Sequence, residues 1–361
     1  MTPGPLAPGA TIGILGGGQL GRMLAMAAAG LGLKVHVLAP ESEAVAAEVA
    51  ARFTCADYDD RAALTAFARG VDVITCEFEN VPAAALAHLA TLRPVRPGAH
   101  AFEIAQDRVA EKRFVEALGG RTAPFLPVDS PADLMDALDR LGTPAILKTR
   151  RLGYDGKGQA RIDRPADAQA ALSLVGGPRD LLLEGFVPFT GEFSILLARG
   201  IDGSIARWPA IANRHAGGIL VRSEAPARDV PPGHVDAASE LAARIAGRLD
   251  YVGVLACEFF ACADGPRFNE MAPRVHNSGH WTIEGALTSQ FEQHVRAIAG
   301  LPLGATDLVA GGAEMHNLLG EEALEAYALL ARPGVHLHLY GKADAAPGRK
   351  MGHVTRLLPW P

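Results

Sequence analysis

The sequence predicts a multidomain α/β protein that starts with a doubly wound parallel sheet and ends in a small β-rich part. Three observations support this fold class. Strands alternate with helices over roughly the first 95 residues, strands dominate the centre, and the last ~55 residues mix short strands with turns. The chain has 361 residues, which is too long for one ordinary hydrophobic core and suits two or three domains.

The N-terminal part has the pattern of consecutive β-α units. Residues 11–15 form a short apolar run, a glycine-rich turn follows at Gly16–Gly21, and an Ala/Met-rich amphipathic stretch predicts a helix to about Leu31. Further strands are expected at 34–38 and 71–76. Ligands bind at the carboxyl ends of strands in such sheets. The glycine-rich turn and Glu77–Asn80 are therefore expected to border a site.

A cluster of Pro and Gly between Arg93 and Gly98 predicts the end of this first unit. Helices are then expected at 107–118, 130–141 and 234–249. The expected central strands are 145–148, 181–187, 192–199, 204–211, 252–260 and 266–271, the last two as a hairpin. The β-rich end part begins near Asp307.

Composition excludes several functional classes. Hydrophobic residues make up 49% and charged residues 20%, with a net charge of −6 and both signs interspersed, so bulk charge indicates neither nucleic-acid nor membrane binding. The four cysteines have no metal-binding spacing, and we expect buried reduced thiols at Cys55, Cys76, Cys257 and Cys262. No signal segment or membrane span is recognisable, so a cytoplasmic protein is expected.

The motif Gly16-Gly17-Gly18-Gln19-Leu20-Gly21 fits G-x-G-x-x-G after a strand and before a helix. Such a turn binds dinucleotides when an acidic residue ends the second strand. Here that strand ends at Leu38-Ala39-Pro40, which argues against a nicotinamide cofactor. Two other interpretations stay open. The backbone N–H groups could bind another phosphate or small polar ligand, or the glycines could serve a tight turn and helix packing.

The segment from Lys148 to Gln159, KTRRLGYDGKGQ, is the strongest single indication of chemistry. A Lys ends an apolar strand, and a loop with three glycines and further cations follows. Glycine N–H groups and cationic side chains together neutralise phosphate oxygens. The segment lacks the Walker pattern G-x-x-x-x-G-K-[ST]. The alternative is a solvated basic loop between two strands.

Two further groups of residues fit a nucleotide site. The backbone at 184–187 could bind an adenine edge and Glu192 the ribose hydroxyls, although a residue such as Glu184 or Glu192 is more often just an exposed strand-end charge. On the predicted hairpin, Glu258 and Glu270 lie on adjacent strands with Asn269 beside them. These oxygen ligands suit Mg²⁺, whereas two opposed surface carboxylates without a cation would repel each other.

Two polar segments complete the set. After the hairpin, Arg274, His276, Asn277 and Ser278 lie within five residues and could bind a small oxyanion beside a nucleotide phosphate. Near the end of the chain, Arg349 and Lys350 form a compact basic turn that suits a substrate phosphate. The alternative for this turn is ordinary solvation of its charges.

Together these segments resemble the ATP-grasp superfamily and, within it, the N5-carboxyaminoimidazole ribonucleotide synthetases. The resemblance runs from about Thr11 to Thr355. It rests on GILGGGQLGRM, EFENV, QDR with a following Lys, ILKTRRLGYDGKGQ, LEGFV, the pattern N-x-H-x-x-G-I-L at 213–220, NEMAPRVHNSGHWT and GRKMGH, in the family's order. The stretches GYDGKGQ and APRVHNSGHWT are the most specific.

The resemblance implies three domains: a Rossmann-like domain at 1–97, an ATP-grasp domain at 98–305 and a β-rich domain at 306–361. It implies ATP-dependent carboxylation of aminoimidazole ribonucleotide by bicarbonate in purine biosynthesis, through carboxyphosphate, with ATP and Mg²⁺ required. Carboxyphosphate would release CO₂ in a closed pocket, with the loop 150–159 as the lid. A homodimer is also implied.

The resemblance also implies a role for each candidate residue. The ATP ligands would be Arg108, Lys148, Gly153, Tyr154, Asp155, Gly156, Lys157, Gly158, Gln159, Glu184, Gly185, Phe186, Val187, Glu192, His215, Asn269 and Glu270, with Mg²⁺ on Glu258 and Glu270. The ribonucleotide would contact Gln19, Leu20, Glu77, Arg349 and Lys350, and the bicarbonate Tyr154, Lys157, Arg274, His276 and Asn277. Glu77 or His276 could accept the proton of the substrate amine.

Three alternatives remain beside this interpretation. Another ATP-grasp ligase with a different acid, such as a formate-dependent glycinamide ribonucleotide transformylase, would share the N-terminal pattern. A nicotinamide oxidoreductase would rest on Gly16–Gly21 alone. A nucleotide-binding regulator without catalysis would have no need of Lys148, Glu258 and Glu270.

Overall fold

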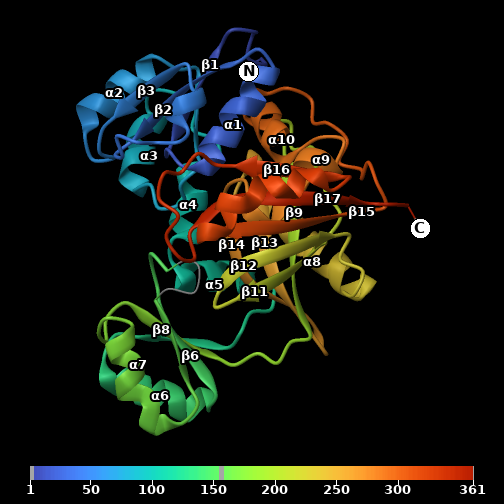
Figure 1. The fold of residues 1–361 in the computed structure, drawn as a ribbon. Helices are drawn as coiled ribbons and strands as arrows, with labels where there is room; N and C mark the ends of the chain where they lie inside the picture. The colour runs from blue at the N-terminus through green and yellow to red at the C-terminus, as the bar shows by residue number, and fades with distance from the viewer. Residues whose placement is uncertain (1–3, 154–157, 361) are drawn as a thin grey trace.

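The computed structural model describes residues 4–153 and 158–360. The N-terminal unit is a four-stranded parallel sheet in the order β3-β2-β1-β4, with α1 on one face and α2 and α3 on the other (Figure 1). Its strands are β1 (Thr11–Leu15), β2 (Lys34–Ala39), β3 (Arg52–Cys55) and β4 (Val73–Cys76). Its helices are α1 (Gln19–Gly30), α2 (Arg61–Arg69), α3 (Ala83–Ala90) and α4 (Ala99–Ala105), with a short 3-10 turn, η1 (Ala47–Val49).

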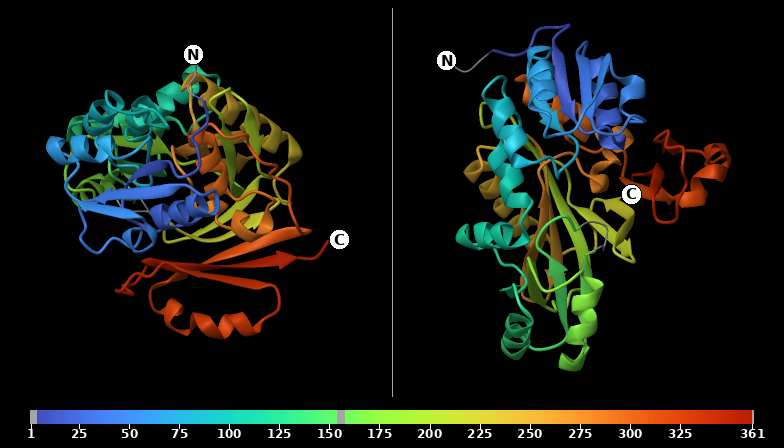
Figure 2. Two further views of the ribbon diagram at one scale, coloured as in Figure 1. Left: turned by 90° about the horizontal axis from the view of Figure 1, so that it is seen from above. Right: turned by 90° about the vertical axis from the view of Figure 1, so that its left-hand side faces the viewer.

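A small lobe follows helix α5 (Arg108–Ala117) and lies at the opposite end of the molecule from the N-terminal sheet (Figure 2, right). Its antiparallel sheet has the order β5-β8-β6-β7, and apolar faces of α6 and α7 cover that sheet. The strands are β5 (Phe125–Val128), β6 (Ala145–Thr149), β7 (Gln159–Ile162) and β8 (Leu181–Gly185). The helices are α6 (Pro131–Leu141) and α7 (Ala168–Leu174), with η2 (Pro165–Asp167) before α7.

The largest sheet has nine strands and continues without a break from the central part into the C-terminal part. Its order is β14-β13-β9-β11-β12-β15-β17-β16, with β10 also paired to β9. The strands are β9 (Gly191–Arg199), β10 (Ile205–Arg207), β11 (Ile211–Ala216), β12 (Ile219–Ala225), β13 (Gly253–Cys262), β14 (Gly265–Ala272), β15 (Gly312–Leu319), β16 (Val335–Leu339) and β17 (Lys350–Leu358). The helices are α8 (Pro232–Arg248), α9 (Thr282–Gly285) and α10 (Gln290–Ala299), with η3 (Asn277–Gly279) and η4 (Gly320–Ala331).

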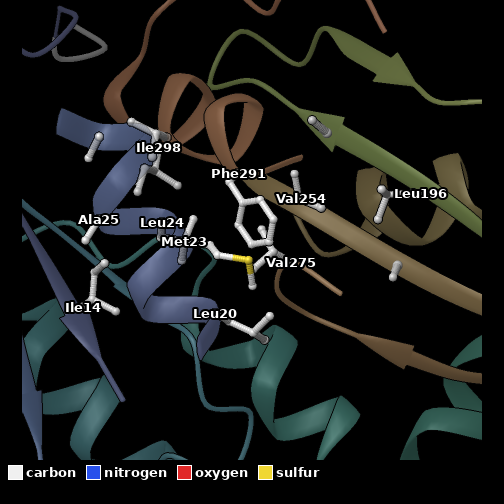
Figure 3. Packing of buried hydrophobic residues seen from close by; sticks show 14 of the residues in the cluster. Ile14, Leu20, Met23, Leu24, Ala25, Leu196, Val254, Val275, Phe291 and Ile298 are labelled. Atoms are coloured by element: carbon white, nitrogen blue, oxygen red, sulfur yellow. The ribbon is translucent and has the colours of Figure 1, made fainter. Parts of the chain in front are cut away.

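One hydrophobic core joins the N-terminal sheet to the nine-stranded sheet. Helix α1 contributes Leu20, Met23 and Leu24, which pack against Phe291 and Ile298 of α10 (Figure 3). The same core continues to residues of β9, β13 and β15. Burying each of these large apolar side chains stabilises the fold by about 1.5–3 kcal/mol. The N-terminal sheet is therefore held firmly beside the central one.

Two predictions about local structure were wrong. The strand expected at 204–211 is interrupted between β10 and β11, where Trp208 is buried and donates its indole N–H to the carbonyl of Thr288 at 3.0 Å. Pro209 follows and has no N–H for a strand ladder.

Cys55 was expected to be buried and is exposed, at the end of the edge strand β3. In the described residues, which include all four cysteines, no disulfide forms. Among the described helices, none combines the length and apolar character needed to cross a bilayer.

Buried His294 of α10 gives a prediction about pH and stability. Its Nδ1 accepts the N–H of Val254 at 3.0 Å, and its Nε2 lies 2.8 Å from the hydroxyl of Thr75 on β4. Burial lowers the pKa of His294 to about 3. The unfolded chain binds a proton below about pH 6.5 while the folded chain does not, so the free energy of unfolding decreases as pH falls from 6.5 toward 3, by up to about 1.4 kcal/mol per pH unit.

Urea unfolding at pH 7 and pH 5 tests this. We expect His294→Gln, whose amide does not titrate in this range, to lose less stability than the parent protein between these pH values. Equal losses in both proteins would show that His294 does not stay neutral in the folded state.

Candidate functional site

Residues of the nine-stranded sheet, together with segments that follow strands of the other two sheets, line one cavity of about 820 Å³. The N-terminal sheet contributes the turn after β1 and the segment after β4, and the nine-stranded sheet contributes β13, β14 and the following loop. The cavity brings together twelve of the candidate residues: Gln19, Leu20, Glu77, Arg108, Gly153, Glu258, Glu270, Arg274, His276, Asn277, Arg349 and Lys350. Segments that are distant in sequence therefore form a single site.

The glycine-rich turn closes around the carboxylate of Glu77. Gly18 donates its N–H to Glu77 Oε1 at 2.8 Å, and Gly21 donates to Oε2 at 3.3 Å. Gly16 has φ +108°, and a Cβ there would lie 2.5 Å from Glu77 Oε1. A carboxylate of the protein thus occupies the anion position at the N-terminus of α1. This geometry explains the glycines without a dinucleotide.

Glu77 is itself buried against the cavity wall. Burial raises the pKa of Glu77, and the N–H donors of Gly18 and Gly21 and the charge of Arg274 counteract only part of that rise. A carboxyl group with a raised pKa is a better base than a solvated one. The site therefore contains a fixed carboxyl group that can accept a hydrogen bond or a proton.

Glu184 is not an exposed strand-end charge but the centre of a buried charge cluster. Its side chain is 5% exposed and lies 2.7 Å from Lys148 Nζ and 2.9 Å from Lys112 Nζ. Burial alone would raise its pKa, but the charges of Lys148 and Lys112 hold the pKa of Glu184 at about 2. Burial lowers the pKa of Lys148. The cluster holds Lys148 at the end of β6.

Arg108 links the hairpin to the glycine loop. It donates to Glu270 Oε2 at 2.9 Å and to the carbonyl of Gly153 at 3.1 Å. The start of the loop is also held, since Arg150 donates to Asp107 at 2.7 Å and Arg151 donates to the same carboxylate at 3.2 Å. Asp107 is in turn the N-cap of α5. Residues 150–153 are thus tied to the start of α5.

The remaining loop residues are only partly described. Tyr154, Asp155, Gly156 and Lys157 lie outside the described residues. Gly158 has φ +70°, and its carbonyl accepts the N–H of Thr149 at 2.8 Å. Gln159 begins β7 and pairs with Lys148.

The hairpin brings Glu258 and Glu270 opposite each other in register, and Asn269 is the extra residue of a β-bulge there. Burial and the charge of Glu270 raise the pKa of Glu258 to about 7. Burial would also raise the pKa of Glu270, but Arg108 outweighs it and lowers that pKa. Two facing carboxyl groups, one with a raised pKa and one with a lowered pKa, are suited to sharing a cation.

In the described ranges, no group of three or more His, Cys, Asp or Glu side chains could hold a metal ion. Two carboxylates nevertheless fit Mg²⁺, which in proteins is often bound by one or two carboxylates together with phosphate oxygens and water. The hairpin therefore fits a nucleotide-bound Mg²⁺ better than a metal held by the protein alone.

The expected adenine hinge lies in the lobe rather than in the cavity wall. The N–H groups of Gly185 and Phe186 donate to the carbonyls of Pro124 at 2.8 Å and Pro144 at 3.2 Å, so these donors are already bonded within the lobe. Val187 is buried, and Phe186 is exposed with the guanidinium of Arg161 over its ring.

Glu192 and His215 form an ion pair. Glu192 Oε2 and His215 Nδ1 lie 2.6 Å apart on the neighbouring strands β9 and β11. Burial would lower the pKa of His215, but Glu192 and the carboxylates of the hairpin raise it. A histidine that is easily protonated thus lies near the hairpin carboxylates.

The loop after β14 is held from three sides. Arg274 pairs with Glu79 of the segment after β4. The backbone of His276 exchanges two hydrogen bonds with the buried amide of Gln290, at 2.9 and 2.7 Å. The ring of His276 contacts Ser278 Oγ at 2.8 Å, and its Nε2 lies 3.7 Å from Glu258. Burial and the charge of Arg274 keep the pKa of His276 well below its usual range, so this histidine is neutral.

Several residues of the site were not found from the sequence. Lys342 lines the cavity and donates to the carbonyl of Lys350 at 2.8 Å, and its position after Gly341 in a turn near Arg349 was an available signal. Gln106 holds the segment after β4 by donating to the carbonyls of Glu79 and Val81, each at 2.8 Å. Asn317 lies in β15 between His316 and Leu318, and no spacing pattern marks it.

Models of known families match nearly all of the chain. The matches are a ribonucleotide synthetase preATP-grasp domain at 9–106, an ATP-grasp domain at 113–291 and a phosphoribosylaminoimidazole carboxylase C-terminal domain at 313–359. A curated relative, the N5-carboxyaminoimidazole ribonucleotide synthase of Brucella melitensis, is 49% identical over 356 residues, which is 98% of each chain.

Solved structures agree with these matches. The N5-carboxyaminoimidazole ribonucleotide synthetase of Thermus thermophilus has a TM-score of 0.90 at 51% identity and covers 96% of this chain and 93% of its own. An Aspergillus clavatus N5-carboxyaminoimidazole synthase, solved with ADP and 5-aminoimidazole ribonucleotide, has a TM-score of 0.90 at 31% identity and covers 98% and 94%.

The three-part architecture and the Lys148, Arg108 and paired-carboxylate geometry define an ATP-grasp ligase. Within that class, the chain belongs to the N5-carboxyaminoimidazole ribonucleotide synthase family.

Gly16→Ala tests the packing of the glycine-rich turn. The new Cβ meets Glu77, and the positive φ is strained for alanine, so we expect a loss of about 1–3 kcal/mol in the free energy of unfolding. Gly30→Ala is the matched control, because Gly30 ends the same helix with no atom within 4 Å of a new Cβ. Urea unfolding should separate the two variants, and similar stability in both would contradict the proposed contact.

The buried charge cluster predicts which of two substitutions costs more stability. Glu184→Gln leaves two buried lysines without an anion and should cost about 3–5 kcal/mol of stability. Lys112→Met leaves the Lys148–Glu184 pair intact and should cost less. Thermal or urea unfolding of both variants measures this, and a larger cost for Lys112→Met would contradict the charge balance described.

Proposed function

We propose that this protein carboxylates 5-aminoimidazole ribonucleotide with bicarbonate and ATP, giving N5-carboxyaminoimidazole ribonucleotide, ADP and phosphate. The observation that carries the proposal is one cavity lined by Glu77 in its glycine cradle, the Arg108–Glu270 pair, the loop from Arg274 to Asn277 and the basic turn at Arg349-Lys350. The family membership supports it, since an Aspergillus relative was solved with ADP and 5-aminoimidazole ribonucleotide.

For the ribonucleotide, we propose binding between the N-terminal and C-terminal walls of the cavity. Gln19, Leu20 and Glu77 would contact the aminoimidazole, and Arg349 and Lys350 the phosphate. Two cations in one turn suit a phosphate dianion. The carboxyl of Glu77 would orient the exocyclic amine and accept its proton when the new C–N bond forms, because its pKa is raised.

For the nucleotide, we propose binding between the lobe and the hairpin. Lys148 and Arg108 would contact its phosphates, together with the glycine loop 153–159, and residues 184–187, Glu192 and His215 would contact its base and sugar. The Lys148–Glu184 contact and the link from Arg108 to Gly153 support this arrangement. Glu258 and Glu270, with Asn269 in the bulge, would hold Mg²⁺, which when bound offsets the charge of the phosphates.

The loop after β14 would bind the bicarbonate. Arg274 supplies a positive charge, and neutral His276 supplies a ring nitrogen 3.7 Å from Glu258. An oxygen of bicarbonate would attack the γ-phosphorus of ATP, ADP would leave, and carboxyphosphate would form. Loss of phosphate yields CO₂, and the amine of the ribonucleotide attacks it. A closed cavity excludes the water that would destroy the intermediate. Tyr154 and Lys157, the other proposed contacts, lie outside the described residues.

We also propose a homodimer in the cytoplasm. The family resemblance supports the dimer, and the exposed Met26 of α1 offers an apolar contact on the N-terminal sheet's helix. The four cysteines without a disulfide fit a reducing compartment. Light scattering of the purified chain measures the mass in solution.

An assay of ADP release tests the reaction. We expect ADP only when Mg-ATP, bicarbonate and 5-aminoimidazole ribonucleotide are all present, with each omitted in turn as the control. Turnover with formate and glycinamide ribonucleotide in place of bicarbonate and aminoimidazole ribonucleotide would instead identify a transformylase.

Glu270→Ala tests the hairpin site. Removing one of the two carboxylates and the partner of Arg108 should lower kcat by about 10³-fold or more, because the charge on the transferring phosphoryl group loses its fixed counterpart. Circular dichroism should be unchanged. Glu240→Ala, at an exposed position on α8, is the control and should keep full activity. Near-native turnover of Glu270→Ala would remove the proposed metal site.

A further inference from the structure

The side chain of Asn277 was expected to bind the oxyanion, but the structure engages nearly all of its amide elsewhere. Asn277 Nδ2 donates to Asn317 Oδ1 at 3.0 Å and lies 3.1 Å from His280 Nδ1. Asn277 Oδ1 accepts from Asn317 Nδ2 at 2.7 Å. Both N–H bonds of Asn277 and one oxygen lone pair are therefore used within the protein. Such an amide has no donor left for an anion.

The orientation of this amide pair is determined by a backbone carbonyl. Asn317 Nδ2 also donates to the carbonyl of Leu220 at 2.7 Å, a contact that an amide oxygen could not make. This contact determines which amide atom of Asn317, nitrogen or oxygen, faces each amide atom of Asn277. The pairing with Asn317 then determines the orientation of the Asn277 amide within the loop. Asn317 is 5% exposed, so water does not compete for these hydrogen bonds.

The chain of hydrogen bonds continues to the C-terminal strands. His280 Nδ1 accepts from Asn277, and it also lies 3.2 Å from the hydroxyl of Tyr340, whose oxygen is 2.9 Å from His353 Nδ1. When His353 Nδ1 donates to the Tyr340 oxygen, the Asn277 amide and the Tyr340 hydroxyl share the single lone pair of His280 Nδ1. Among the described residues, the Nε2 atoms of His280 and His353 are buried without a hydrogen-bond partner. His280, Tyr340 and His353 are each at most 1% exposed. The network is therefore shielded from bulk solvent.

We propose that Asn317 is a positioning residue for the reaction, which holds the loop 274–280 in place through its amide pair with Asn277. Asn277 then acts through Asn317 and His280 rather than as a ligand of the oxyanion. The inference rests on the proposed function, since it assigns the loop to the bicarbonate site. It also means that β15 completes that site, because β15 carries Asn317 and pairs with β12.

A double-mutant cycle on Asn277 and Asn317 tests the proposal. The variants Asn277→Ala, Asn317→Ala and the double variant are compared with the parent protein by ADP release at varied bicarbonate. We expect each single variant to lose about tenfold in kcat/KM for bicarbonate, because each removes both hydrogen bonds of the amide pair. The double variant should lose no more than either single variant, because both remove the same pair. The KM values for ATP and ribonucleotide should stay within about twofold of the parent protein, since neither asparagine contacts those ligands in the proposal.

Met315→Leu is the matched control. Met315 is a fully buried residue two positions before Asn317 on the same strand and lies outside the amide pair. Its kinetics should match those of the parent protein. If Asn317→Ala does not fold, Asn317→Leu and Asn277→Leu replace the alanine variants in the same cycle, because leucine fills the space and makes no hydrogen bond.

Several outcomes of these measurements would contradict the proposal, each for a different reason. Losses that add in the double variant, or an Asn277→Ala loss at least tenfold larger than that of Asn317→Ala, would show that Asn277 binds the anion directly. An unchanged kcat/KM for bicarbonate in Asn317→Ala would show that the pair is merely structural. If the parent protein itself needs no bicarbonate, the proposed function fails and the inference fails with it.

Discussion

Helix α1 packs Leu20, Met23 and Leu24 against α10, and this apolar contact places the N-terminal sheet beside the nine-stranded sheet. The rest of the site depends on it. Glu77 and Glu79 come from the segment after β4, whereas Arg274 and His276 come from the loop after β14. Hydrophobic burial is non-directional, so it holds the two sheets together while specific polar contacts set the details of the cavity.

Those polar contacts share one feature, in that three carboxylates at or near the cavity each have a compensating partner. Two N–H donors serve Glu77, two lysines serve Glu184, and Arg108 serves Glu270. The compensation is needed because an unpaired ion in a region of low dielectric costs several kcal/mol. It also leaves the charges fixed in position, which is the arrangement that stabilises developing charge in a reaction.

The C-terminal part contributes both to the central sheet and to the site. Strands β15, β17 and β16 extend the nine-stranded sheet, and the turn before β17 brings Arg349 to the cavity. Behind the loop after β14, the side chains of Asn317, Tyr340 and His353 form the network that holds Asn277 and His280. The same strands thus supply one wall of the cavity and the support for another.

Sequence by itself determined much of the molecule. Period-two and period-3.6 patterns predicted β1, α1, α6 and the hairpin of β13 and β14, because these elements depend on local alternation and turns. Twelve candidate residues do line one cavity, since the chemical character of a glycine loop or of a pair of carboxylates can be recognised from the amino-acid sequence. The boundaries 1–97, 98–305 and 306–361 stay predictions, and one shared core crosses the first of them.

Tertiary structure alone decided which partner each polar group meets. It assigned the N–H groups of the glycine turn to Glu77, gave Glu184 two lysines, and used the amide of Asn277 for Asn317. These partners are 40 or more residues apart, except Lys148 and Glu184, and no periodicity couples positions at such separations. A side chain's chemical type is written in the sequence, but its hydrogen-bond partners depend on packing that brings distant strands together.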